Sequence, residues 1–66
     1  MEKGEVIAFN KAAGKGFILN PYNKLYYLFQ YSDCIDPINV GDNVIFEPYQ
    51  ANGAINIKRY QQAKAS

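Results

Sequence analysis

The chain has 66 residues, 20% of them charged, and a formal net charge of +1, so it forms one small domain without the strongly basic balance typical of duplex-DNA binders. A chain of about this size buries only roughly 60% of its unfolded surface, which leaves no room to enclose a cofactor. Histidine is absent and Cys34 is the only cysteine, so an internal disulfide is excluded and we expect no catalytic residue, metal ion or cofactor.

The first predicted strand runs from Glu5 to Asn10 and is apolar on both faces. A loop from Lys11 to Lys15 follows and leads into a second strand from Gly16 to Leu19. Successive side chains of a strand point to opposite faces of the sheet. We therefore expect Phe17 to be exposed and Ile18, on the other face, to be buried in the core.

The third predicted strand, from Leu25 to Tyr31, is the most aromatic stretch of the chain. The preceding Asn20-Pro21 pair predicts a turn, because proline removes a ladder donor and asparagine tolerates left-handed backbone. At a period of two, one face carries Leu25, Tyr27, Phe29 and Tyr31, and the other carries Tyr26, Leu28 and Gln30. A slip of one residue would exchange the two faces, so the sequence leaves both registers open.

A single helical turn is predicted over residues 32–35, with Ser32 or Asp33 as its N-cap and Asp36-Pro37 ending it. The two aspartates are therefore interpreted as a cap and a turn-former rather than as a catalytic pair. Cys34 is expected to be a small buried hydrophobic residue, because no histidine or basic cluster adjoins it in the sequence to activate its thiol.

The fourth strand is predicted from Asn43 to Tyr49, after a turn at residues 40–42. Pro48 suits a sheet edge or a bulge, because it cannot donate to the ladder. Asn52-Gly53 is a favourable hairpin dipeptide and introduces the fifth strand, from Ala54 to Arg59.

Five short strands without a long helical pattern predict an all-β fold. Closure removes exposed sheet edges, so we predict a small five-stranded barrel that occupies residues 1–60. Residues 61–66 are polar and are expected to fray. The chain stops there without a structural reason, which is typical of a domain cut from a longer protein.

These motifs, in this order, resemble the cold-shock domain family, whose members are five-stranded oligonucleotide/oligosaccharide-binding (OB) barrels. The family's glycine and first strand ending in Phe-Asn are similar to residues 4–10, and its Lys-Gly-Phe-Gly-Phe-Ile motif is similar to residues 13–18. Its Val-Phe-Val-His-Phe-Ser motif would lie on residues 27–32. Its Gly-Gln-x-Val-x-Phe-Glu and Ala-x-Asn-Val motifs resemble residues 41–47 and 54–57.

The resemblance implies a domain that binds single-stranded RNA or DNA with little sequence preference. Bases would stack on exposed aromatic rings, and phosphates would run past lysines. The six tyrosines and four phenylalanines are more than a small core can hold, which also favours an exposed aromatic face. The candidate nucleic-acid-binding residues are Phe9, Asn10, Lys11, Lys15, Phe17, Tyr26, Leu28, Gln30 and Tyr31.

Several positions depart from the family where the family stacks bases. The strand-one tryptophan is Ala8 here, a motif phenylalanine is Lys15, and an outward phenylalanine and the histidine are Leu28 and Gln30. These departures and the near-neutral charge support an alternative interpretation. In it, the barrel's stacking face has become a docking surface for a protein partner, or for another part of the same protein, with weak or no nucleic-acid binding.

The expected cellular context follows from what the sequence does not show. It begins Met1-Glu2-Lys3-Gly4 without an apolar signal segment, and no apolar run approaches the length that spans a membrane. We therefore expect a cytoplasmic domain that makes no membrane contact and acts as a monomer.

Overall fold

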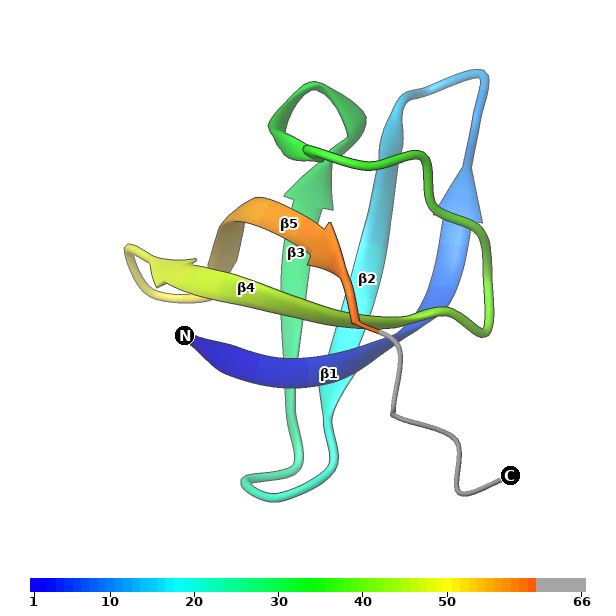
Figure 1. The fold of residues 1–66 in the computed structure, drawn as a ribbon. Coiled ribbons are helices and arrows are strands. Elements are labelled where there is room, and N and C mark those ends of the chain that lie inside the picture. The colour runs from blue at the N-terminus through cyan, green and yellow to red at the C-terminus, as the bar shows by residue number, and fades with distance from the viewer. Residues whose placement is uncertain (61–66) are drawn as a thin grey trace, which may run out of the picture.

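The computed structural model describes residues 1–60 (Figure 1). It contains five strands and one 3₁₀ turn: β1 (Glu2–Asn10), β2 (Lys15–Asn20), β3 (Leu25–Gln30), η1 (Tyr31–Asp33), β4 (Asn43–Tyr49) and β5 (Gly53–Arg59). The strands form a closed barrel in the order β1-β2-β3-β5-β4. This confirms the predicted all-β barrel of five strands, which is consistent with a small OB fold. The expected fraying of residues 61–66 lies outside the described residues.

β1 is shared between two neighbouring strands, one for each half of its length (Figure 1). Its first half, from Glu2 to Glu5, pairs with β4, and its second half pairs with β2. A bulge between Val6 and Ala8 separates the two registers and bends the strand. The predicted start at Glu5 is wrong by three residues, because the polar first residues become a strand only through pairing with β4, far away in the sequence.

The barrel interior is filled by side chains from every strand and from the connection between η1 and β4. The buried hydrophobic residues are Val6, Ile18, Tyr27, Phe29, Ile38, Val44, Phe46, Ala54 and Ile57. Gly16 allows the Phe29 ring to approach β2, because a Cβ atom at this position would lie 2.6 Å from that ring. Ile18 is fully buried, as its position on the strand predicts.

The central part of β3 has the predicted alternation, with Tyr27 and Phe29 buried and the residues beside them exposed. At the two ends, Leu25 and Tyr31 belong to the same face by period but are exposed, and for Tyr31 this agrees with its place among the candidate binding residues. Leu25 is the first residue of the strand, and Tyr31 has already left the strand for η1.

The predicted helical turn over residues 32–35 begins one residue too late and ends two residues too late, and its predicted cap is also wrong. The turn covers Tyr31–Asp33, and Gln30 occupies the N-cap position without a side-chain hydrogen bond to the turn. Instead, the first backbone N–H of the turn donates to the carbonyl of Gly14 in the β1–β2 loop, at 2.8 Å. This long-range bond replaces the local cap, so neither Ser32 nor Asp33 is needed for that role.

Asp36 and Cys34 lie in the connection that follows η1. The Asp36 carboxylate accepts the backbone N–H of Arg59 at 2.9 Å, so it ties the connection to the end of β5. Cys34 is half-buried rather than fully buried. Desolvation by burial, with a smaller contribution from the negative charge of Asp33, raises the pKa of the Cys34 thiol to about 11. The thiol is therefore protonated at neutral pH.

A polar network fastens the start of β1 to the β2–β3 turn. Asn20 is buried, and its Nδ2 donates to the Glu2 carboxylate at 2.8 Å while its Oδ1 accepts the backbone N–H of Tyr22 at 2.9 Å. The Tyr27 hydroxyl donates to the same carboxylate at 3.2 Å. Burial of these polar groups is stable because each has a partner.

Candidate nucleic-acid interface

Two rows of outward-facing side chains cross the sheet formed by β1, β2 and β3. The strand register aligns each row, because cross-strand partners on one face of a sheet lie side by side. The apolar row consists of Ala8, Phe17 and Leu28, and the polar row consists of Asn10, Lys15 and Gln30. All of these residues are exposed, so both rows are open to a ligand.

An aromatic stack lies beside these rows. The rings of Phe9 and Tyr31 are stacked, with centroids 5.4 Å apart and an interplanar angle of 25°. Phe9 also contacts the buried ring of Phe29, with centroids 5.8 Å apart. Tyr31 is 44% exposed. Its ring therefore combines an accessible surface with support from a side chain that is itself packed on the core.

A shallow hollow of about 460 Å³ occupies the middle of this surface. Phe9, Phe17 and Leu28 give it apolar walls, and Asn10 and Lys15 add polar groups. Phe17 is 45% exposed, which agrees with the prediction that it faces outward. An exposed ring next to a lysine is suited to a flat, negatively charged ligand such as a nucleotide.

Two further hollows continue the first one. One is lined by Phe9, Lys11 and Tyr31, and the other reaches from Leu28 and Gln30 to the β4–β5 hairpin. Phe9 and Leu28 each line the middle hollow and one of its neighbours, so the three hollows lie side by side, and together we call them the aromatic groove.

The aromatic groove contains all of the sequence-predicted binding residues except Tyr26. Tyr26 is 58% exposed and lies two residues before Leu28 on the same outer face of β3, opposite Leu19. Tyr26 thus extends the exposed aromatic surface beyond the aromatic groove.

The sequence analysis missed the contribution of the β4–β5 hairpin. Tyr49, at the end of β4, is exposed and lines the third hollow together with Asn52 and Asp33. The hairpin reaches the groove because β5 pairs in parallel with β3, which places Gly53 beside Leu28. A tyrosine at a strand end beside an Asn-Gly turn was the available signal, but the pairing that brings it to the groove is not visible in the local sequence.

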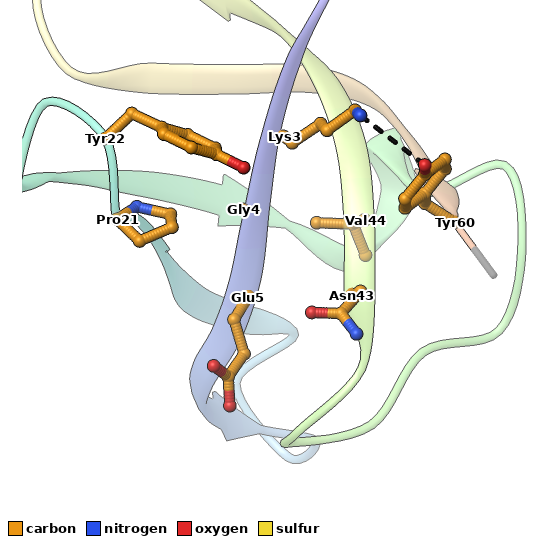
Figure 2. A pocket seen from close by; sticks show the side chains of 8 residues that line it. All are labelled: Lys3, Gly4, Glu5, Pro21, Tyr22, Asn43, Val44 and Tyr60. Carbon is orange, nitrogen blue, oxygen red and sulfur yellow. Dashed lines mark hydrogen bonds between the residues drawn. The ribbon is translucent and has the colours of Figure 1, made fainter. Parts of the chain in front are cut away.

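A separate hollow lies around the first half of β1 (Figure 2). Tyr22 lies on one side of β1, and Lys3 reaches toward Tyr60, with its ammonium nitrogen 4.7 Å from the ring centroid and 3.4 Å from the hydroxyl oxygen. Glu5 lines the same hollow. The opposite charges of Lys3 and Glu5 give this hollow no preference for phosphate, so we do not place the nucleic-acid site here.

Comparisons with known proteins add no family name to this geometry. No protein-family model matches the chain, and no curated protein is similar to it in sequence. No helix within residues 1–60 is long and apolar enough to cross a membrane. The structure itself shows a closed five-stranded barrel that is consistent with an OB fold and carries a surface cluster of aromatic residues.

Proposed function

We propose that this domain binds single-stranded nucleic acid along the aromatic groove. The observation that carries the proposal is that the exposed rings of Phe17 and Tyr31 lie in adjacent hollows, each together with a lysine, Lys15 or Lys11. Unpaired bases stack on aromatic rings whatever the nucleotide sequence, and lysines attract the phosphates between the bases. We further propose that the domain acts as a monomer and catalyses no reaction.

The expected affinity is modest. Stacking is worth about 1–3 kcal/mol per base, and Phe17 and Tyr31 are the two rings of the groove that combine high exposure with a neighbouring lysine. Each phosphate neutralised on a single strand makes the slope of log affinity against log salt concentration more negative by about 0.7. Two lysines therefore give a shallow slope of about −1.4, and we expect low sequence preference and measurable binding mainly at low salt.

A titration of fluorescently labelled single-stranded oligonucleotides, followed by anisotropy at two salt concentrations, tests the proposal. Phe17→Ala removes one stacking ring and should weaken binding at least about fivefold, the equivalent of about 1 kcal/mol. Tyr22→Ala is the matched control, because Tyr22 is 80% exposed but lies outside the groove. Absence of saturable binding at low salt, or equal binding by the wild type and Phe17→Ala, would refute the proposed function.

A protein-docking role for the same groove is the second candidate. Two observations favour it. In the apolar row, Ala8 and Leu28 flank Phe17 without offering flat rings for stacking. In the third hollow, the negative charge of Asp33 would repel a phosphate. Affinity capture from a lysate with and without nuclease separates the two roles. Capture of a defined protein that survives nuclease and is lost in Phe17→Ala would support docking over nucleic-acid binding.

A further inference from the structure

Two polar side chains, Asn10 and Lys15, line the middle hollow of the aromatic groove. The orientation of the Asn10 amide is fixed by a hydrogen bond. Its Oδ1 accepts the backbone N–H of Ala13 at 3.1 Å. A backbone N–H can only donate, so the oxygen of the amide faces Ala13, and within residues 1–60 the Nδ2 group donates to no other residue. This bond lies within the β1–β2 loop, where the backbone N–H of Gly14 also donates to the Asn10 carbonyl at 2.8 Å. The loop thereby fixes the amide with its N–H donors available.

The second polar group of the hollow is the ammonium of Lys15. Lys15 is the direct cross-strand partner of Asn10, and both residues line the hollow beside Phe17. An ammonium group has three donors and no acceptor. A base that stacks on Phe17 would therefore meet two neighbouring donor groups, the Nδ2 of Asn10 and the ammonium of Lys15, while the Asn10 Oδ1 is already engaged by the Ala13 N–H.

Two adjacent donors distinguish among the bases. Cytosine has adjacent acceptors at O2 and N3, and guanine has adjacent acceptors at N7 and O6. In uracil and thymine the N3–H donor separates the two carbonyl acceptors, and in adenine an amine lies beside each of the acceptors N1 and N7. We propose that the middle hollow is a base-selective subsite that takes cytosine or guanine in preference to uracil, thymine or adenine. This inference rests on the proposed nucleic-acid binding and adds a preference to it.

The selectivity belongs to the middle hollow alone. Gln30 is the next residue of the polar row, opposite Lys15, but it lines the neighbouring hollow together with Asp33. The Gln30 amide offers both a donor and an acceptor, so it accommodates either kind of base edge. The rest of the groove thus binds all bases by stacking, and Asn10 with Lys15 supplies the discrimination at one position.

The test compares short cytidine and uridine homo-oligonucleotides of equal length by anisotropy at low salt. The two pyrimidines have the same ring size and differ in their hydrogen-bonding edge, so stacking contributes similarly to both. We expect the wild type to bind the cytidine strand about fivefold more tightly, the lower end of the discrimination given by a paired contact to a base edge. Equal affinities would overturn the inferred preference while leaving the proposed function intact, whereas no binding of either strand would overturn both.

Asn10→Asp is the decisive variant. It keeps the oxygen that accepts the Ala13 N–H and replaces the free donor by an acceptor, so the ratio of the two affinities should fall to about one. Gln30→Glu is the matched control, because it adds the same charge to the same row and should weaken both strands without changing their ratio. Lys15→Gln provides a second route, since it removes the donor-only character without adding negative charge. A cytidine preference that persists in both Asn10→Asp and Lys15→Gln would refute the assignment.

Discussion

Replacing Gly16 by alanine should destabilise the barrel severely. A Cβ atom at this position would lie 2.4 Å from the backbone oxygen of Ala8 and 2.6 Å from the Phe29 ring. Neither neighbour can move cheaply, because the oxygen belongs to the paired strand β1 and the ring is fully packed in the core. Overpacking of this kind costs about 1–3 kcal/mol, and with two rigid obstacles we expect the upper end of that range.

The magnitude is large for a domain of this size. At about 0.05–0.15 kcal/mol per residue, the whole chain has a free energy of unfolding of about 3–10 kcal/mol. A loss of about 3 kcal/mol lowers Tm by about 12–24 °C for a domain of fewer than about 100 residues. The Phe9–Tyr31 stack rests on Phe29, so the substitution should also weaken oligonucleotide binding at temperatures where the variant is still folded.

Urea denaturation and thermal melting, both followed by circular dichroism, measure the effect. Gly14→Ala is the matched control, because Gly14 has a φ of 69° and an added Cβ would have no atom of residues 1–60 within 4 Å. It should lose only the cost of left-handed backbone, about 1–2 kcal/mol. A Gly16→Ala variant as stable as the wild type, or more stable than Gly14→Ala, would contradict the reasoning from the close approach of Phe29.

Three further predictions concern the network, the thiol and the lysines. Asn20→Ala removes a donor from the Glu2 carboxylate and the acceptor of a turn N–H. It should lower the free energy of unfolding by about 1–3 kcal/mol in urea titrations. An unchanged urea midpoint would show that the network contributes nothing to stability. The pKa of Cys34 is raised to about 11, so alkylation by iodoacetamide at pH 8 should be about a hundredfold slower than for an unperturbed thiol. The alkylation rate should increase about tenfold per pH unit up to that pKa. A rate that levels off near pH 9 would contradict the raised pKa. Lys15→Gln should reduce the salt slope of oligonucleotide binding by about 0.7, and an unchanged slope would remove Lys15 from the phosphate path.

Features encoded by neighbouring residues were predictable from the sequence. Strand alternation placed Ile18 inside and Phe17 outside. It also grouped Tyr27 with Phe29 on one face of β3, but it left open which face is buried. The number of strands followed from the turn residues between them. These features depend on side-chain period and local backbone preference, which a single sequence displays directly.

Features that depend on distant pairing were not predictable in the same way. Glu2 and Lys3 are polar and show no strand pattern, yet pairing with β4 makes them part of β1. The η1 turn needs no side-chain cap because the carbonyl of Gly14 supplies its first bond. Tyr49 enters the groove only through the parallel contact between β3 and β5. In each case the deciding partner lies elsewhere in the chain.

The sharing of β1 between β4 and β2 has a consequence for how the chain matures on the ribosome. The first half of β1 has its partner in β4, which follows β1, β2 and β3 in the chain. A nascent chain that ends before residue 43 therefore cannot close the barrel. Pairings of such large sequence separation form slowly, because their loop-closure entropy must be overcome before any contact offsets it. Until β4 and β5 are synthesised, the aromatic rings of the groove and those of the core are both exposed to solvent. Early release or truncation should therefore yield aggregates rather than a smaller folded domain.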